Sequence, residues 1–372
     1  MNILHYTGMP TSQKYGGVER WIIEFAQQAT VLKHNIYISY TQTFPLIKEL
    51  VDDYQQAKLH ILITPNKNCT SLLKQIEENK IDIIFFHFAE PYNEPLYIKK
   101  HTNCKVYCFF HCYNYYSNLK WHKNFRELLC ASIYRAKMFY SQFYIDGYFA
   151  VSKAVKKQFM KFCFIHPCKI KQIYLGVEKR KIEHSPHKSN IVIIGCIACH
   201  DKCKGIDILI DAASILKKEK YMFEIWQIGG GMSFNKGKDT NELHKLVENK
   251  KLNNEFKFLG VRNDINTLLS QMDIYVQPSK REAISLTIAE AMMAQLPVVA
   301  SNTDGIPEYI EHGQNGFLYK NNDPTQLAKY LKLLIENLNL RTDIGKRGYQ
   351  FINQNSFSIS QSVRKIINLT LK

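Results

Sequence analysis

Short runs of β-branched and aromatic residues alternate with stretches of helical periodicity, and this alternation constrains the fold more than any other feature. In the first half, such runs predict buried parallel strands at residues 2–6 (NILHY), 35–40 (NIYISY), 58–63 (KLHILI), 82–88 (DIIFFHF), 105–110 (KVYCFF), 147–152 (GYFAVS) and 169–174 (KIKQIY). Helical patterns lie between or after them at residues 18–32, 70–79 and 125–144. Strands and helices that alternate in this way are typical of βαβ units.

The alternation starts again after a polar, proline-containing linker at residues 178–190. Expected strands occupy residues 191–198, 223–229, 256–260, 273–277 and 297–301, and expected helices occupy residues 205–218, 241–250, 265–271, 285–295 and 324–338. Two βαβ series predict an α/β chain of two doubly wound, Rossmann-like domains, residues 1–183 and 184–372, with a ligand site in the cleft between them. The last helix, about residues 357–370, is a candidate to pack back on the first domain.

Length and composition agree with two globular domains. A single core rarely grows beyond about 250 to 300 residues, and this chain has 372, of which 45% are apolar. The start, MNILHYTGMP, lacks the pattern of a secretory signal, and no stretch approaches the roughly 18 apolar residues of a membrane span. We therefore expect a cytoplasmic protein whose ten cysteines are mostly free thiols.

Positive charge is concentrated in one segment. The net charge is +16, and residues 97–180 supply 13 of it, with 16 Lys and Arg against 3 Asp and Glu. The same segment is rich in aromatic residues: Tyr113, Tyr115, Tyr116, Trp121, Phe125, Tyr134, Phe139, Tyr140, Phe143 and Tyr144. Such a mixture suits an anionic membrane surface or a nucleic acid. A core helix with a solvated lysine face would also produce it.

Glycines mark two strand-to-helix turns that suit phosphate groups. In QKYGGVER, Gly16 and Gly17 precede the first helix, and in IACHDKCKGID, Lys204 and Gly205 open the first helix of the second domain. Backbone amides at a helix N-terminus bind anions. One such turn is a weak indication, because glycine often serves only local geometry. Two turns, one in each domain, indicate a diphosphate held between the domains.

Two glutamates lie in the stretch REAISLTIAEAM, residues 281–292. Glu290 falls among helix formers that end before Pro297, whereas Glu282 precedes them in a polar run. One carboxylate therefore belongs to a loop before a helix, and the other to the helix itself. The positive end of the helix dipole lies between them in the sequence and favours an anion there.

These motifs resemble a known family, the retaining glycosyltransferases of family 4. The matching motifs are GGVER near the start, FFHCY at 109–113, YLGVE at 174–178, KG at 204–205, FLGVRND at 258–264, REAISLTIAEAM, LPVVASNTDGIPEYIEHGQNGFLY at 296–319 and NDP at 322–324. They occur in the family's order and cover nearly the whole chain. The resemblance implies the GT-B fold, in which two Rossmann-like domains face each other across the active site.

The resemblance also implies roles for individual residues. Glu282 would lie near the hydroxyls of the donor sugar, and Glu290 would hydrogen-bond the ribose. The amides of Leu286 and Thr287 would face the distal phosphate, and His111 matches the family's histidine near the reacting centre. The implied catalytic residues are His111, Glu282 and Lys204, and the implied donor-binding residues are Gly16, Gly17, Lys202, Lys204, Val261, Ser285, Leu286, Thr287 and Glu290.

No metal and no other cofactor is expected. Folds that use a metal to hold the leaving diphosphate commonly carry an Asp-x-Asp pair, and this sequence has none. Lys204, the glycine turn and the helix dipole would stabilise the leaving group instead. A metal cluster is an alternative interpretation of Cys196, Cys199, Cys203 and His200. Structural zinc usually needs two separated pairs of ligands, so we interpret these cysteines as core thiols.

Two positions depart from the family pattern. The family usually has an arginine five residues before the lysine, and here that position is Cys199. Lys202 or His200 would then supply a second cation, or Lys204 would act with helix dipoles alone. Ser285 stands where a glycine is common, which is a milder change.

The sequence therefore predicts a metal-independent, retaining glycosyltransferase of the hexosyltransferase class. It would move a sugar from a nucleotide-sugar donor to a saccharide acceptor, expected to be lipid-linked, in cell-surface polysaccharide or lipopolysaccharide synthesis. Residues 97–180 would hold it at the inner face of the plasma membrane. A sugar-nucleotide epimerase or phosphorylase on the same fold is an alternative, as is a basic nucleic-acid-binding protein. No epimerase or nucleic-acid motif supports either one, and no nucleic-acid partner is expected.

Overall fold

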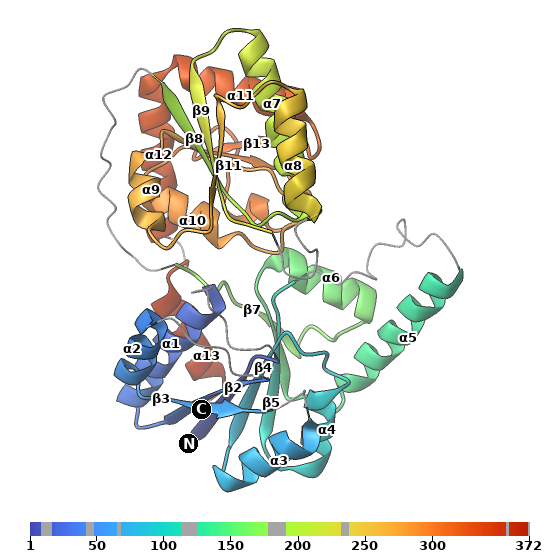
Figure 1. The fold of residues 1–372 in the computed structure, drawn as a ribbon. Helices are drawn as coiled ribbons and strands as arrows, with labels where there is room; N and C mark the ends of the chain where they lie inside the picture. Colours follow the sequence, from blue (N-terminus) through green and yellow to red (C-terminus); the bar gives the residue numbers. More distant parts are fainter. Residues whose placement is uncertain are drawn as a thin grey trace. The chain divides into compact units, whose positions relative to one another are not determined.

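The computed structural model describes residues 1–8, 17–41, 48–64, 68–112, 125–177, 191–231, 238–354 and 357–370. The chain divides into two compact units, one formed by Met1–Gly176 with Ile359–Lys372 and the other by Val177–Ser358. Figure 1 shows that each unit is a sheet with helices on both faces. The expected linker at residues 178–190 lies outside the described residues.

The first unit is built on seven parallel strands in the order β3-β2-β1-β4-β5-β6-β7. The strands are β1 (Asn2–Tyr6), β2 (Asn35–Tyr40), β3 (Leu59–Ile63), β4 (Ile83–His87), β5 (Lys105–Phe110), β6 (Gly147–Ala150) and β7 (Ile170–Gln172). The central strands are continuous apolar runs because helices cover both faces, and every residue of β4 is buried. The strand order reverses between β1 and β4, so the carboxyl ends of these strands form the switch point where ligands bind in such sheets.

The helices of the first unit are α1 (Gly17–Val31), α2 (Lys48–Gln56), α3 (Cys69–Glu78), α4 (Glu94–His101), α5 (Phe125–Ser141), α6 (Lys153–Cys163) and α13 (Ile359–Thr370). The C-terminal helix α13 lies against α1. Trp21 Nε1 donates a hydrogen bond to Ser362 Oγ at 3.0 Å, and Gln28 Nε2 donates to Ser360 Oγ at 2.7 Å. The last helix of the chain therefore completes the N-terminal unit.

The second unit is built on six parallel strands in the order β10-β9-β8-β11-β12-β13. The strands are β8 (Val192–Ile197), β9 (Phe223–Ile228), β10 (Phe256–Gly260), β11 (Ile274–Gln277), β12 (Val298–Ser301) and β13 (Phe317–Tyr319). The α-helices are α7 (Ile206–Lys218), α8 (Lys238–Asn249), α9 (Ile265–Gln271), α10 (Leu286–Met293), α11 (Pro324–Glu336) and α12 (Leu338–Gln354), and the short 3-10 helices are η4 (Lys202–Lys204) and η6 (Ile306–Glu308). Apolar residues of α7 and α11 pack on the strands and form the core.

The sequence predicts most of these elements to within a few residues, and β1, β2, β5, β10 and α9 begin and end where they are expected. It does not predict α2, α4, α6, α12 and β13. The helix α12 is the most instructive of these, because it contains two glycines that disfavour an isolated helix. A Cβ at Gly345 would lie 1.9 Å from Gln295 O, so close packing, and not propensity, requires glycine in this helix.

Candidate active site

Lys204 and Glu282 form an ion pair in the second unit. Lys204 Nζ lies 2.8 Å from Glu282 Oε2, and the two side chains are 25% and 12% exposed. Lys204 ends η4 after β8, and Glu282 lies in the loop between β11 and α10. Burial by itself lowers the pKa of Lys204, but attraction to the Glu282 carboxylate and the hydrogen bond between them raise this pKa on balance. Lys204 is therefore a firmly protonated cation.

Backbone contacts hold the η4 loop against the loop that carries Glu282. Cys203 O accepts hydrogen bonds from the amides of Lys280, at 2.7 Å, and Arg281, at 3.3 Å. Gly205 has a φ of +67°, and a Cβ there would lie 2.0 Å from Pro278 O. Only glycine fits this position. The glycine that the sequence indicates for phosphate binding therefore also brings the two loops together.

A chain of polar side chains supports the Glu282 carboxylate. Ser279 Oγ donates to Glu282 Oε2 at 3.1 Å and accepts from Gln277 Nε2 at 2.8 Å. The other side-chain atom of the Gln277 amide, Oε1, accepts a hydrogen bond from Thr287 Oγ1 at 3.0 Å. Gln277 and Ser279 are fully buried, and a satisfied buried network holds its members in one arrangement. The network therefore links Glu282 to the first turn of α10.

Helix α10 begins directly after this loop. Ser285 is its N-cap residue, and the Ser285 hydroxyl accepts a hydrogen bond from the amide three residues further on. Leu286 and Thr287 form the first turn, and Glu290 lies one turn further along the helix, partly exposed. The positive end of the helix dipole is thus connected through hydrogen bonds to the Lys204–Glu282 pair, an arrangement that favours a bound anion.

Asp304 fixes the backbone of Glu282. Its Oδ2 accepts a hydrogen bond from the Glu282 amide at 3.1 Å and from Arg281 Nε at 3.3 Å. The Glu282 carbonyl accepts a hydrogen bond from the Gly305 amide at 3.0 Å. Burial raises the pKa of Asp304, although the Arg281 guanidinium opposes this. Both the main chain and the side chain of Glu282 are therefore held in place.

The position where the family usually has arginine is occupied by Cys199, and burial raises the pKa of its thiol. Lys202 Nζ lies 3.4 Å from Glu242 Oε2, and its side chain is 72% exposed. His200 is buried, and both of its ring nitrogens are hydrogen-bonded at 2.8 Å to side chains of α8 and β9. Neither Lys202 nor His200, the two candidates for the second cation, pairs with Glu282. Among these three residues, only Lys204 does.

Val261 is brought to the glycine run that follows β9. Its side chain is 52% exposed, and a Cβ at Gly230 would lie 3.1 Å from Val261 Cγ2. Gly229 has a φ of +131°, and a Cβ there would lie 2.1 Å from Ala198 O. The glycines therefore allow the turn after β9 to pass closely between the loops after β8 and β10.

The glycine turn of the first unit is described only in part. Gly17 is the first residue of α1, whereas Gly16 lies outside the described residues. The proposed contact of Gly16 with the donor stays a prediction.

His111 directly follows β5 in the first unit and stacks against two aromatic rings. The ring centroids of His111 and Phe88 are 4.5 Å apart, and those of His111 and Phe109 are 5.5 Å apart. Phe88 has a φ of 59°, an uncommon conformation for a bulky residue. Burial lowers the pKa of His111 to about 3. His111 is therefore a neutral imidazole, and its Nε2 lies 2.9 Å from His87 Nδ1.

The ten cysteines are all free thiols. Cys196 is part of the core of the second unit, and burial raises its pKa to about 12. Within the described ranges, no three His, Cys, Asp or Glu side chains come together as metal ligands would. The alternative metal cluster of Cys196, Cys199, Cys203 and His200 is therefore not formed.

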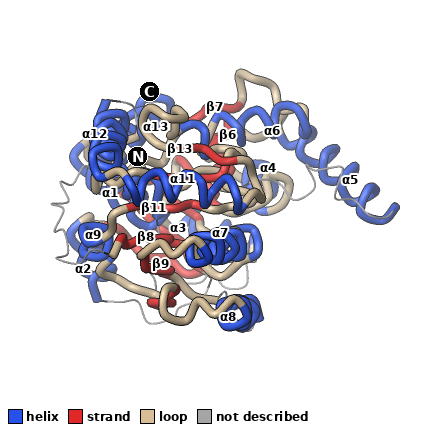
Figure 2. The backbone as a smooth tube through the Cα atoms, turned by 90° about the horizontal axis from the view of Figure 1, so that it is seen from above, coloured by secondary structure: helices blue, strands red, loops and turns tan. Residues whose placement is uncertain are grey.

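Helix α5 and the turn after it expose much of their apolar surface. Leu129, Phe139 and Phe143 are 50%, 44% and 67% exposed, whereas Tyr134 and Met138 are buried. Figures 1 and 2 both show α5 extending away from the sheet of its unit. The alternative that the segment 97–180 contains a core helix with a solvated lysine face is therefore wrong for this face of α5. Among the described residues, no helix is both long and apolar enough to span a membrane.

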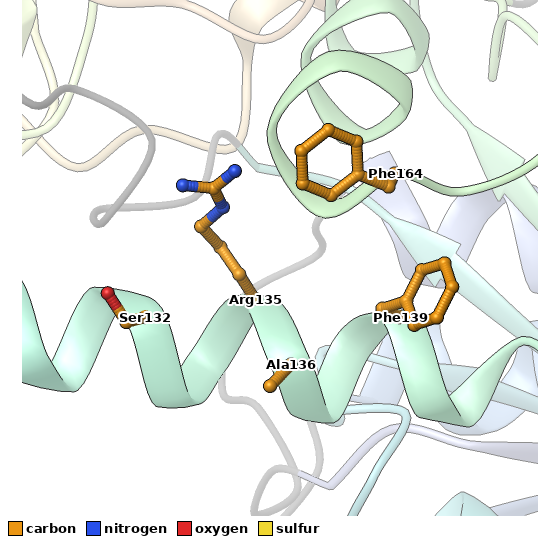
Figure 3. A pocket seen from close by; sticks show the side chains of 5 residues that line it. All are labelled: Ser132, Arg135, Ala136, Phe139 and Phe164. Carbon is orange, nitrogen blue, oxygen red and sulfur yellow. The ribbon is translucent and has the colours of Figure 1, made fainter.

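A groove of about 360 Å³ lies between α5 and the end of α6. Figure 3 shows the side chains that line it, Ser132, Arg135, Ala136, Phe139 and Phe164. The Arg135 guanidinium lies 4.9 Å from the centre of the Phe164 ring, within the range of a cation–π contact. The groove therefore combines apolar rings with a positive charge. Several aromatic and basic residues of this segment lie outside the described residues, namely Tyr113, Tyr115, Tyr116, Lys120, Trp121 and Lys123.

Family models match the chain in two consecutive parts. A model described as Glycosyltransferase Family 4 matches residues 15–181, and one described as Glycosyl transferases group 1 matches residues 177–351. The chain belongs to the group 1, family-4-like glycosyltransferases. The family expected from the sequence motifs is confirmed, whereas the retaining mechanism stays a prediction.

Curated relatives match part of the chain. An uncharacterized glycosyltransferase of Methanocaldococcus jannaschii is 32% identical over 234 residues, which make up 59% of this chain and 57% of the relative. The lipopolysaccharide core biosynthesis glycosyltransferase LpsE of Rhizobium meliloti is 25% identical over 147 residues, 40% of each chain. The matched regions thus span 57% and 40% of these two relatives.

A solved structure matches the whole chain. HepE of Anabaena, in complex with UDP and glucose, superposes with a TM-score of 0.83 over 100% of this chain and 99% of its own. The two sequences are 19% identical, so the likeness concerns the fold. The expected GT-B fold with two Rossmann-like units is confirmed for this glycosyltransferase.

The structure brings several residues to these sites that no sequence motif indicates. Gln277 and Ser279 support Glu282, and Asp304 holds its backbone, while His5 and His87 lie behind His111. Polar residues at the ends of expected buried strands were the available signal. Gln277 ends the expected strand 273–277, and both histidines lie near the carboxyl ends of expected strands.

Proposed function

We propose that this glycosyltransferase moves a sugar from a nucleotide-sugar donor to a saccharide acceptor, with retention of the anomeric configuration. The observation that carries the proposal is the Lys204–Glu282 pair and its hydrogen-bonded connection to the first turn of α10. A leaving nucleoside diphosphate gains negative charge, which a fixed cation and oriented amides stabilise. A carboxylate suits the neutral hydroxyls of a sugar or ribose.

In this proposal, different residues of the second unit bind different parts of the donor. Lys204 and the amides of Leu286 and Thr287 bind the diphosphate, and Glu290 binds the ribose. The diphosphate shares the ammonium of Lys204 with Glu282, which frees carboxylate lone pairs for the hydroxyls of the sugar. The anomeric carbon then gains oxocarbenium character as the diphosphate leaves. The proposal places His111, as a neutral imidazole, near the reacting centre.

We further propose that the transfer needs no metal. The ammonium of Lys204 provides the positive charge that a divalent cation supplies elsewhere, and the dipole of α10 adds to it. The donor is best sought first among uridine diphosphate sugars, because the structurally similar HepE binds UDP and glucose. A role in lipopolysaccharide or capsule synthesis is supported by the relatives named for those pathways.

The acceptor is proposed to be lipid-linked, and the protein to work at the cytoplasmic face of the plasma membrane. Support comes from α5 and the turn after it, where exposed Leu129, Phe139 and Phe143 lie in the segment that carries most of the positive charge. Apolar side chains enter the boundary between headgroups and acyl chains. Each basic residue near an anionic bilayer contributes about 1 kcal/mol to binding.

The donor is tested by thermal unfolding in the presence of UDP, GDP and ADP and their sugars. A ligand that binds only the folded state raises the unfolding temperature. The sugar nucleotide that gives the largest rise is then incubated with the protein, with and without a lipid-linked saccharide, and the anomer of the product is determined by NMR. Epimerised donor without released nucleotide, or no stabilisation by any nucleotide, would contradict the proposal.

A further inference from the structure

Three histidines of the first unit form a continuous hydrogen-bonded row. His5 Nδ1 lies 3.1 Å from His87 Nε2, and His87 Nδ1 lies 2.9 Å from His111 Nε2. The ring centroids are 5.4 Å apart between His5 and His87 and 5.1 Å apart between His87 and His111. The row runs from the core of the sheet to the residue assigned to the reacting centre.

The register of the sheet explains the row. β1, β4 and β5 are neighbours, His5 pairs with Phe85, and His87 pairs with Phe109. His87 therefore lies two residues beyond Phe85, the partner of His5. His111 likewise lies two residues beyond Phe109, the partner of His87. Side chains two residues apart share one face of a strand, so the three rings lie on a diagonal across a single face.

All three imidazoles are neutral. His5 and His87 are fully buried, and burial lowers the pKa of His5 to about 3. Burial also takes the pKa of His87 well below its usual value, and the neighbouring histidines lower it further. A neutral imidazole carries one N–H and one lone pair, so each ring has one nitrogen that can donate and one that can accept. His87, in the middle of the row, must do both.

Only two arrangements of protons satisfy both hydrogen bonds. If Nδ1 of His5 donates to His87, then Nδ1 of His87 donates to His111, and His111 also carries its proton on Nδ1. If Nε2 of His111 donates to His87, then Nε2 of His87 donates to His5, and His5 also carries its proton on Nε2. All three rings thus share one tautomer in either arrangement.

The two free ends of the row are linked by this constraint. His5 Nε2 and His111 Nδ1 are buried and have no hydrogen-bond partner among the described residues. His5 lies among the rings of Trp21, Phe25 and Phe85, with ring centroids 5.9, 4.7 and 5.1 Å away. A proton on Nε2 of His5 therefore requires a lone pair on Nδ1 of His111, and the reverse arrangement makes Nδ1 of His111 a donor.

We propose that His5 and His87 are positioning residues that fix which ring nitrogen of His111 carries its proton. They would decide whether Nδ1 of His111, which is buried in this structure, is a donor or an acceptor towards a sugar that reaches it. Neither His5 nor His87 reaches the ligand. The effect on transfer rests on the proposed function, whereas the coupling of the three tautomers does not.

The tautomers are measured by NMR on protein labelled with ¹⁵N in histidine, because the nitrogen shifts distinguish Nδ1–H, Nε2–H and imidazolium forms. In the unliganded wild-type chain we expect His5, His87 and His111 to show the same single tautomer. Different tautomers among the three, or an imidazolium at neutral pH, would overturn the proposal.

Two substitutions of His5 test whether this end of the row determines the tautomer of His111. His5→Phe fits the aromatic surroundings but removes the hydrogen bond to His87, whereas His5→Asn keeps a polar group near the position of Nδ1. We expect His111 to show mixed tautomers in the phenylalanine variant and the wild-type tautomer in the asparagine variant. Unchanged His111 shifts in a folded His5→Phe protein would overturn the proposal.

Kinetics separate this proposal from the proposed function. We expect His5→Phe to lower kcat about tenfold with little change in KM, and His5→Asn to restore most of it. Equal kcat values for wild type and His5→Phe would overturn the catalytic relevance of the row. Coupled tautomers in a protein that transfers no sugar would leave the row intact and reject only the transferase proposal.

Discussion

Lys204 and Glu282 are 78 residues apart in the sequence, yet Lys204 Nζ lies 2.8 Å from Glu282 Oε2 in the second unit. The pair depends on Gly205, whose missing side chain lets the η4 loop approach Pro278. It also depends on Ser279, which donates a second hydrogen bond to the same carboxylate oxygen. Because the two residues neutralise each other, a substitution at either one changes the charge that the other presents to a donor.

Lys204→Ala is expected to lower kcat about 100- to 1000-fold, because it removes a fixed cation from the developing charge of the diphosphate. EDTA should leave the wild-type rate unchanged if no metal shares this role. A matched control is Lys250→Ala, which breaks an ion pair with Asp211 in the same unit and should retain the wild-type rate. Steady-state kinetics check both substitutions. Loss of activity with EDTA and recovery with magnesium would contradict the metal-free mechanism.

Glu290→Ala and Glu282→Ala should affect different kinetic constants. The ribose contact is made equally in the ground and transition states, so Glu290→Ala should raise KM and weaken nucleotide binding. The contact of Glu282 with the reacting sugar strengthens as charge develops, so Glu282→Ala should mainly lower kcat. The exposed Glu248 provides the control Glu248→Ala. Calorimetry with the nucleotide and steady-state kinetics test the division, and unchanged constants in both variants would reject the site.

The sequence predicts the sheets well because their strands are buried on both faces and read as continuous apolar runs. It predicts less well the elements whose stability comes from packing, such as α12, in which Gly345 lies against Gln295. The alternative of a core helix fails at α5 for a related reason. Periodicity shows that one face of a helix is apolar, but it does not show whether another element covers that face.

The candidate site could be predicted from the sequence only as separate motifs. The motif glutamates and Lys204 were expected near a donor, but the ion pair between Lys204 and Glu282 depends on loop geometry that no local pattern encodes. The positions of His5 and His87 beside His111 are likewise not encoded by a local pattern. Each looks like an ordinary strand residue, and only the register of β1, β4 and β5 brings them into line with His111.

Gly205→Ala should destabilise the second unit far more than Gly313→Ala. Both glycines have positive φ, +67° and +76°, but a Cβ at Gly205 would lie 2.0 Å from Pro278 O, whereas a Cβ at Gly313 would meet no atom within 4 Å. Alanine at residue 313 should cost about 1–2 kcal/mol for its backbone conformation alone. Alanine at residue 205 should cost more than about 3 kcal/mol, because the clash adds to the conformational cost. Denaturant unfolding measures both, and equal losses would contradict the close contact.

The free energy of unfolding should decrease as the pH is lowered, because His5 and His87 are neutral in the folded protein. Above pH 6.5, the ordinary histidine value, neither the folded nor the unfolded state binds a proton at these residues. Below it, the unfolded chain binds protons that the folded chain excludes, and for His5 this continues down to about pH 3. Each such histidine should cost about 1.4 kcal/mol per pH unit.

Denaturant unfolding between pH 7.5 and 4.5 tests this dependence. His5→Phe removes one of the two fully buried histidines, so its free energy of unfolding should fall less steeply below pH 6.5 than that of the wild type. The curves of the two proteins should converge on a constant difference above pH 7. Parallel curves over the whole range would show that His5 takes up its proton equally in both states.

Helix α5 should bind anionic membranes through its exposed apolar residues and the positive charge around them. We expect the protein to sediment with anionic liposomes at low salt, to be released at high salt, and not to bind neutral liposomes, because salt screens the attraction of basic residues. The double variant Leu129→Glu with Phe143→Glu adds negative charge to the surface and removes apolar contact, so it should no longer sediment.

The control, Val31→Glu with Leu338→Glu, changes two apolar residues that are 82% and 63% exposed on other elements, and it should bind as the wild type does. Donor binding should be the same in all of these proteins. Equal sedimentation of the two double variants, or equal binding to neutral and anionic liposomes, would exclude α5 as the membrane-binding surface.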